Sequence, residues 1–311
     1  MKAAVLLLFL TVLLTFPSAS QQLPQHSQYM WMPGRFNPAW TGSQDHMTAT
    51  LWHRNQWTSL EGGPVITFAH VEMPLSMVGI RGGAGLSVAS DKARPNRDVF
   101  LTGSYAYHAP LGKGTLGLGL SAGLAHRASK PFPNDSETGG EDSEAPVTTQ
   151  SEEKKSAIDL SLGTRFQTGN FYVGLSVLHL TEPTLSPGDS LDRLKRVLYL
   201  TSGYTWQLNH PLWAIRPSLL LCHNGVHTSV TGSVLAMYDK RMWGGFSYGH
   251  DALTLLLGIS LYSGLQIGYA YDLAVPDTKP ARGGSHEFMV RYHFRAGKDR
   301  NTGKYKSVRY L

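Results

Sequence analysis

The feature that most constrains this chain is a two-residue alternation of large apolar and small residues. It is clearest in Leu116-Gly117-Leu118-Gly119-Leu120-Ser121-Ala122-Gly123-Leu124, where leucine or alanine takes every second position and glycine or serine the others. Successive side chains of a β-strand point to opposite faces, so this segment predicts a strand with one apolar face. A membrane barrel directs such a face at lipid and keeps a small or polar face toward its lumen.

The alternation recurs from residue 46 onward. It predicts fourteen strands, at 46–54, 64–73, 78–90, 98–109, 114–127, 156–166, 171–178, 197–206, 213–221, 227–237, 242–248, 253–261, 265–271 and 285–294. Most have the ~9–11 residues that a tilted membrane strand needs. An even number returns both chain ends to one side of the membrane. We therefore expect an all-β fold, a transmembrane antiparallel up-and-down β-barrel of about 14 strands over residues 46–294. Pro217 makes its strand the weakest assignment, because proline cannot donate to a ladder.

The connections between these strands differ in length. The odd-numbered ones span 55–63, 91–97, 128–155, 179–196, 222–226, 249–252 and 272–284. The even-numbered ones span 74–77, 110–113, 167–170, 207–212, 238–241 and 262–264. Outer-membrane barrels have short periplasmic turns and long extracellular loops. We therefore expect the odd connections outside the cell and both termini in the periplasm.

The two ends of the chain carry further signals. Lys2, an apolar run to Phe16 and the small residues Ser18-Ala19-Ser20 predict a secretory signal peptide over residues 1–20. The run is shorter than the ~20 residues of a spanning helix. Residues 21–45 are then an N-terminal periplasmic or plug segment. The tail 295–311 is basic and is either solvated or a docking segment, with its candidate contacts at Lys298, Arg300, Lys304, Lys306 and Arg309.

Residues with catalytic or metal-binding chemistry form no recognisable pattern. Cys222 is the one cysteine, so neither an intrachain disulfide nor a cysteine-based zinc site is possible. His223 and His227 bridge a predicted loop and strand, where their spacing carries little meaning. The glycines at 82–85 lie within a predicted strand and precede no helix. The net charge of +6 is modest and does not argue for nucleic acid. We expect no catalytic, cofactor-binding or metal-binding residues, and no enzyme.

Aromatic residues and turn formers are unusually dense between residues 29 and 74. Trp and Tyr suit a membrane interface, and an Asn-Pro pair favours a turn. Arg54 could bond a carboxylate bidentately or stack on Trp57. Two interpretations stay open: an aromatic girdle with a barrel plug, or a docking surface. The candidate partner-binding residues here are Asn37, Pro38, Trp40, Arg54, Gln56 and Trp57.

At these residues the chain resembles the PorP/SprF family, outer-membrane proteins of the Bacteroidetes type IX secretion system. The matching segments follow in order: Phe36-Asn37-Pro38-Ala39-Trp40-Thr41-Gly42-Ser43, Arg54-Asn55-Gln56-Trp57, Gly63-Pro64 with Thr67, Tyr105-Ala106-Tyr107, Gly117-Leu118-Gly119-Leu120, His179-Leu180-Thr181-Glu182-Pro183, and Ser285-His286-Glu287-Phe288-Met289-Val290-Arg291-Tyr292 with Phe294. The acidic connection 128–155 is longer than expected for this family, and the basic tail matches none of its motifs.

The resemblance implies a role without catalysis. It implies partners in the periplasmic ring proteins PorK and PorN and the peptidoglycan-associated PorE, with export or surface attachment of cargo proteins. A second hypothesis is an outer-membrane transporter for hydrophobic small molecules, which needs an apolar path and a movable plug. The predicted lumen, with Asp159, Gln266, Glu287 and Arg291 facing inward, favours docking.

Overall fold

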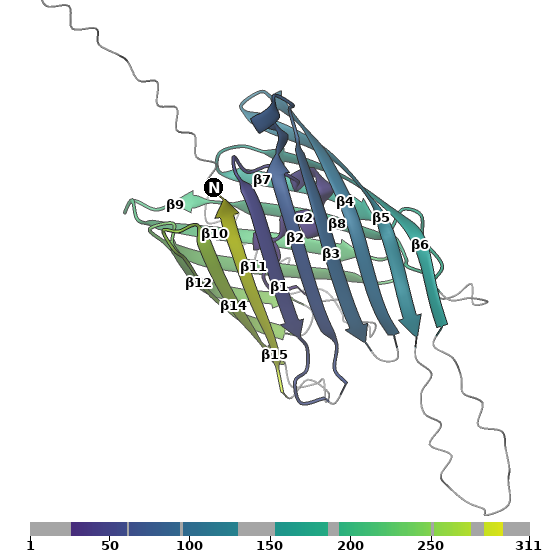
Figure 1. The fold of residues 1–311 in the computed structure, drawn as a ribbon. Helices are drawn as coiled ribbons and strands as arrows, with labels where there is room; N and C mark the ends of the chain where they lie inside the picture. Colours follow the sequence, from purple (N-terminus) through teal and green to yellow (C-terminus); the bar gives the residue numbers. More distant parts are fainter. Residues whose placement is uncertain are drawn as a thin grey trace, which may run out of the picture.

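The computed structural model describes residues 26–60, 62–93, 96–129, 153–185, 193–249, 252–274 and 283–294. In these residues the chain forms a single antiparallel sheet closed into a barrel (Figure 1). Its strands are β1 (Met47–Asn55), β2 (Val65–Pro74), β3 (Gly83–Ala93), β4 (Asn96–Leu111), β5 (Gly114–Ser129), β6 (Glu153–Gln167), β7 (Phe171–Leu178), β8 (Val197–Tyr204), β9 (Trp206–Gln207), β10 (Trp213–His223), β11 (Thr228–Tyr238), β12 (Met242–Gly249), β13 (Ala252–Ser260), β14 (Leu265–Ala274) and β15 (Ser285–Phe294).

Each strand pairs with its sequence neighbours, and the barrel closes between the first and last strands. β1 pairs with β15 over its whole length, from Met47 opposite Phe294 to Asn55 opposite His286. The two-residue β9 continues the line of β8 along β10. Counted with β8 as one strand, it gives the described barrel fourteen strands around its circumference. The predicted fold class is confirmed. Among the helices of the described residues, none has the length and apolar character needed to cross a membrane.

Pro217 sits within β10 at a break in its ladder. β10 pairs with β9 through Ile215 and with β8 from Ser218 onward, so residues 216–217 have no partner on that side. Proline has no backbone N–H to donate. The interruption therefore tolerates proline inside a strand that is otherwise regular.

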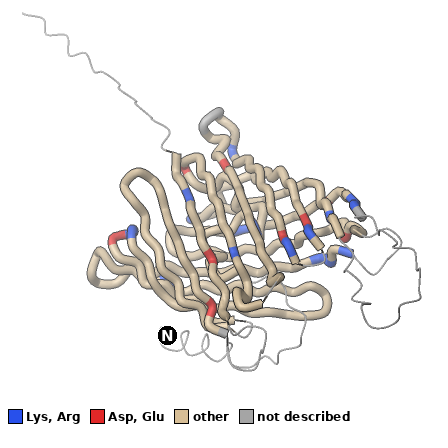
Figure 2. Tube along the Cα trace, turned by 60° about the horizontal axis from the view of Figure 1, so that its bottom comes forward, with Lys and Arg blue, Asp and Glu red and all other residues tan. Residues whose placement is uncertain are grey.

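The large apolar and the small residues that alternate in the sequence lie on opposite faces of the barrel wall. Leu118, Leu124 and Ile158 expose 51%, 52% and 64% of their surface on the outside. Ser121 and Ser161, which are paired across β5 and β6, are buried toward the lumen. Figure 2 shows that most of the wall carries neither basic nor acidic residues. The exposed apolar face is the one that meets lipid.

Some predicted boundaries are wrong, and each error has a local cause. The strand predicted at 78–90 begins at Gly83, because Leu75–Val78 form a 3₁₀ helix, η3, that ends at Gly79 with φ +83°. The predicted connection 91–97 is largely strand, since β3 runs to Ala93 and β4 starts at Asn96. Asp91 and Lys92 are adjacent, so charged residues lie on both faces of the strand there. At the rim of the barrel, however, a strand can continue past the lipid with polar residues on both faces.

The segment before β1 lies inside the barrel. It forms η1 (Tyr29–Trp31), α2 (Pro33–Phe36) and η2 (Pro38–Trp40), three short helical turns that occupy the lumen (Figure 1). We call residues 26–46 the plug. It packs its aromatic side chains into two buried clusters with inward residues of the wall, and these clusters are the core of the protein.

Candidate functional site

The plug crosses the lumen from one end of the barrel to the other. Its first residues, His26 and Ser27, lie beside Thr231, Gly249 and Thr254, near the end at which the odd-numbered connections leave. Ser43 lies at the opposite end, beside the β4–β5 turn. The cavity left beside His26 and Ser27 is about 20 Å³, enough for roughly one water molecule. The plug therefore fills this part of the lumen.

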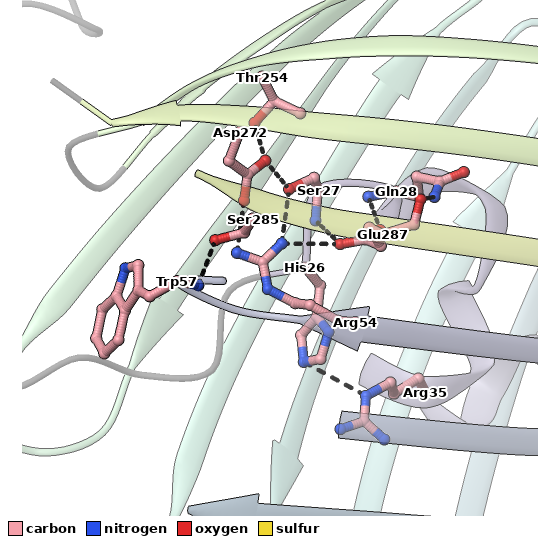
Figure 3. A network of polar contacts seen from close by, with 10 residues as sticks. All are labelled: His26, Ser27, Gln28, Arg35, Arg54, Trp57, Thr254, Asp272, Ser285 and Glu287. Atoms are coloured by element: carbon pink, nitrogen blue, oxygen red, sulfur yellow. Dashed lines mark hydrogen bonds and ion pairs between the residues drawn. The ribbon is translucent and has the colours of Figure 1, made fainter. Parts of the chain in front are cut away.

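A buried ion-pair network holds the start of the plug, and we call it the latch. Its centre is Arg54 at the end of β1, which is fully buried (Figure 3). Arg54 donates from Nη2 to Asp272 Oδ2 at 2.5 Å and from Nη1 to Glu287 Oε2 at 3.1 Å. Its Nη1 also donates to Ser27 Oγ at 3.2 Å. One guanidinium thus joins the first strand, the last two strands and the plug.

The plug backbone completes the latch from the other side. The backbone N–H groups of Ser27 and Gln28 donate to the two oxygens of Glu287 at 3.0 and 2.8 Å. Ser27 Oγ and Thr254 Oγ1 each donate to Asp272 Oδ1 at 2.7 Å. A buried carboxylate is costly unless it is paired and hydrogen-bonded. Arg54 and Thr254 of the wall supply part of this pairing, and the plug completes it through Ser27 N, Ser27 Oγ and Gln28 N.

Asn37 fixes the middle of the plug against β6 and β7. Its Nδ2 donates to the backbone oxygens of Thr164 and Leu175 at 2.9 and 3.3 Å. Its Oδ1 accepts from Ala39 N at 2.9 Å and caps η2. A side-chain oxygen that accepts from the first turn of a helix satisfies an otherwise unpaired donor. Asn37 therefore both shapes the plug and attaches it to the wall.

Glycines on the lumenal face make room for this part of the plug. A Cβ atom on Gly163 of β6 would lie 2.0 Å from Asn37 Oδ1, and one on Gly119 of β5 would lie 2.2 Å from Ala39 N. Such distances exclude any side chain unless the plug moves. The glycine-leucine alternation of the sequence thus serves both faces: leucine meets lipid and glycine admits the plug.

The end of the plug is fixed at a turn. Gly42 adopts φ +60°, and its N–H donates to Glu72 Oε2 at 2.8 Å. A Cβ there would lie 2.4 Å from Met73 O, so both the conformation and the space require glycine. Thr41 Oγ1 donates to Ser104 Oγ at 3.1 Å. These contacts turn the chain into β1.

Aromatic and cationic side chains fill the space around the plug helices. Trp31 packs on Trp243 with ring centroids 4.4 Å apart. The Arg165 guanidinium lies over the Trp40 ring at 4.5 Å, an arrangement in which the ring face attracts the cation. Tyr29 OH bonds Ser218 Oγ at 3.0 Å. The plug is therefore seated by packing as well as by hydrogen bonds.

His26 is buried at the start of the plug. Its ring lies 4.8 Å from that of Trp52, and its Nε2 accepts a hydrogen bond of 3.4 Å from Arg35 Nε. Burial, reinforced by the charges of Arg35 and Arg54, holds the pKa of His26 well below its usual value. His26 is consequently neutral at physiological pH.

The structure places the predicted docking residues in different environments. Asn37, Pro38, Trp40, Arg54 and Gln56 are buried within the barrel. Trp57 is half-buried, and its N–H donates to Ser285 Oγ at 3.2 Å. Asn37 and Arg54 contact the barrel's own residues, so a partner could reach them only if the plug moved. The tail residues Lys298, Arg300, Lys304, Lys306 and Arg309 lie outside the described residues, as do residues 1–20.

Sequence reasoning missed some residues of the site. Asp272 was not singled out, and Glu287 was placed in the lumen without its partner. Arg54 does bind carboxylate, and in fact it binds two. The strand register would have predicted this ion pair, because pairing β1 with β15 places Arg54 directly opposite Glu287. In the same way, the glycines of β5 and the Asn37-Pro38-Ala39 segment, which are far apart in the sequence, pack against each other in the folded protein.

These features define an outer-membrane β-barrel whose lumen is occupied by its own N-terminal segment. The chain belongs to the family of the type IX secretion system membrane protein PorP/SprF, whose model matches residues 18–292. It is therefore a membrane component of that secretion system. Its closed barrel with an exposed apolar wall places it in the outer membrane, which it crosses many times. Among curated proteins none matches the chain.

Solved structures share the barrel at low sequence identity. The toluene transporter TbuX of Ralstonia pickettii has a TM-score of 0.52 at 12% identity, covering 83% of this chain and 91% of its own. Omp33 of Acinetobacter baumannii has a TM-score of 0.47 at 9% identity, covering 82% and 100%. A Pseudomonas aeruginosa FadL homologue has a TM-score of 0.44 at 13% identity, covering 83% and 93%. At these identities the likeness shows the fold alone.

Proposed function

We propose that this barrel acts in type IX secretion by docking periplasmic partners, and that its lumen is not the path of the cargo. The observation that carries the proposal is the plug. It is attached by the latch near one end, by Asn37 in the middle and by Gly42 near the other end. A folded cargo protein cannot share this lumen, so the barrel supports export through its surfaces. The role involves no catalysis.

The partners we propose are those that the family resemblance implies. They are the ring proteins PorK and PorN, the peptidoglycan-associated PorE, and exported cargo. The proposed orientation puts both termini in the periplasm, because the two longest connections, 130–152 and 179–196, both leave the opposite end of the barrel. The basic tail 295–311 then follows β15 directly on the periplasmic side. Asn37, Pro38, Trp40, Arg54 and Gln56 act in this scheme by holding the plug, and Trp57 lies at the outer end.

A truncation tests the docking role of the tail. Ending the chain after Arg295 keeps β15 whole, so the amount of barrel in the membrane should stay normal. A matched full-length variant replaces Lys298, Arg300, Lys304, Lys306 and Arg309 with glutamine and removes charge without removing length. Both should lower recovery of PorK, PorN or PorE after affinity purification, and more so at high salt, because exposed charges are screened.

The outcomes separate docking from small-molecule transport. A transporter would show normal partner recovery and normal cargo export in both variants. If only the truncation lowers recovery, the tail acts by its length or shape and the electrostatic part of the proposal fails. If neither variant changes recovery, the tail is not the docking surface.

A further inference from the structure

A polar pocket of about 530 Å³ opens at the end of the barrel where the even-numbered turns lie. Its rim is formed by residues 112–113 and 168–169 of two of those turns, with Gly114 and Thr115 at the start of β5. Ser43 borders it from the end of the plug, and the side chains of His108, Arg165 and Gln167 line it from the wall. The pocket is thus built jointly by β4, β5 and β6 of the wall, two turns and the plug, and none of the functions assigned above uses it.

The lining of the pocket has one sign of charge. Lys113 is exposed on the β4–β5 turn, and Arg165 lies deeper on β6. Its lining residues include no Asp or Glu. Hydroxyl groups of Ser43, Thr115 and Thr168 add donors. The composition therefore suits an anion.

The Arg165 side chain is buried with few partners. It is 3% exposed, and among the described residues its guanidinium makes one hydrogen bond, from Nη1 to Gln167 Oε1, and no ion pair. Its Nε has no hydrogen-bond partner there, nor does His108 Nε2. Arginine stays charged in proteins, and a buried charge is costly unless it is paired. Arg54, by contrast, is paired with two carboxylates. Arg165 stacks on Trp40 but has no carboxylate bonded to it among the described residues, so its guanidinium keeps donors free for an anion.

We propose that this pocket binds carboxylate groups of an acidic protein segment. The proposal rests on the docking function proposed above, and it names the chemistry by which a periplasmic partner is held. A lipid headgroup is the poorer fit, because the pocket lies inside the ring of strands. The chain's own acidic connection, 130–152, leaves from the opposite end of the barrel. The occupant is therefore a segment of another protein.

The bound state follows from the geometry of the lining. A carboxylate at the inner wall accepts from the Arg165 guanidinium, which the Trp40 ring and β5 already hold in position. Lys113 at the rim meets a second acidic group nearer the solvent. Charge-assisted hydrogen bonds to arginine are roughly twice as strong as neutral ones. Arg165 should consequently dominate the affinity, with Lys113 adding a weaker, salt-dependent part.

The test measures binding of a labelled peptide to the purified full chain in detergent. The probe is a fluorescein-labelled hexapeptide of glutamate and glycine, followed by fluorescence anisotropy at low ionic strength, with its glutamine counterpart as control. Arg165→Gln should weaken binding by at least about tenfold, since it removes a buried charged partner. Lys113→Gln should weaken it by a few-fold and reduce its dependence on salt.

Matched controls lie at the same end of the barrel. Arg216→Gln alters another arginine stacked on the plug, over Trp31 at 5.6 Å, but outside the pocket. Lys240→Gln removes an exposed lysine from the β11–β12 turn. Both should bind the acidic peptide as the unaltered chain does. If Arg165→Gln does not fold, as judged by heat-modifiable mobility on gels, the test is the difference in peptide binding between Lys113→Gln and Lys240→Gln.

Several outcomes would overturn the inference. They are equal binding of the glutamate and glutamine peptides, unchanged binding in both Arg165→Gln and Lys113→Gln, or equal loss in the controls. Inorganic phosphate that displaces the peptide at equal concentration would make this a phosphate site instead. Because the peptide assay uses the isolated chain, its failure is distinct from failure of the docking function, which is judged by partner recovery from cells.

Discussion

Arg54 is the residue on which the plug, the first strand and the last two strands depend together. Its replacement by alanine leaves Asp272 and Glu287 buried beside each other without their cation. Breaking a buried ion pair from one side costs about 3–5 kcal/mol, because the remaining charge stays desolvated. We expect Arg54→Ala to lower the free energy of unfolding by about that amount. Urea titration in lipid vesicles, followed by tryptophan fluorescence, measures it.

The control for this prediction neutralises the partners as well. Adding Asp272→Asn and Glu287→Gln to Arg54→Ala removes the uncompensated charges and should recover part of the lost stability. Arg54→Lys keeps the charge without the two-armed geometry and should fall between the two. A triple variant no more stable than Arg54→Ala would show that the latch does not act through these charges.

His26 makes the seating of the plug depend on pH. In the unfolded chain its pKa is near the ordinary value of about 6.5, while burial lowers it well below that in the folded protein. Above about pH 6.5 both states are neutral and the plug has its full stability. As the pH falls further, His26 binds a proton when the plug has left the lumen but stays neutral while the plug is bound. The free energy that holds the plug in the lumen therefore decreases until the pH reaches the pKa of His26 in the folded protein.

Hydrogen exchange of the plug amides measures this dependence. Exchange between residues 26 and 41, corrected for the intrinsic effect of pH, should speed up as the pH is lowered from neutral to acidic. His26→Phe keeps an aromatic ring between Phe36 and Trp52 and should remove the change. A plug whose protection is the same at both pH values in the unaltered chain would contradict the role of His26.

At the scale of single residues, sequence reasoning reached the type of contact but not the partners. It expected Arg54 to bind a carboxylate. It could not name Asp272, which lies far along the chain and meets Arg54 only after the barrel closes. The burial of Asn37 and Trp40 follows from the plug entering the lumen, and local patterns do not encode that path.

The plug packs closely against the strands because glycines at the contact have no side chain. A Cβ on Gly163 would lie 2.0 Å from Asn37 Oδ1, whereas one on Gly103 of β4 would meet only Ala122 O at 3.8 Å. We expect Gly163→Ala to displace the plug and raise ion conductance in planar bilayers. Gly103→Ala is the matched control and should conduct as the unaltered chain does. Equal, low conductance in both would mean that the plug does not depend on this contact.

At the scale of elements, the alternation predicted the strands well because it records which face meets lipid. It failed where that constraint ends. At the rim, in residues 91–93 and 96–97, the strands continue with polar residues on both faces, so no alternation marks them. The 3₁₀ helices of the plug have three residues each, which is too few for a helical repeat to be recognised in the sequence. Their positions depend on glycines in strands distant along the chain.

For the whole molecule, the closed barrel and the occupied lumen limit what the protein can do. We propose that this membrane component of the type IX secretion system, whose lumen holds its own N-terminal segment, acts by docking partners and does not conduct cargo. Family membership supports the secretion role, and the plug supports docking as its mechanism. The identity of the partners is the part of the account most open to direct test.

The most direct test is crosslinking of the full chain in native outer membranes, followed by purification and mass spectrometry. The docking role predicts crosslinks from the tail and from the turn end of the barrel to PorK, PorN or PorE. Crosslinks from residues near Trp57 should instead reach no periplasmic protein. Recovery of the chain with none of these partners, while the barrel is present at its normal level, would contradict the docking role.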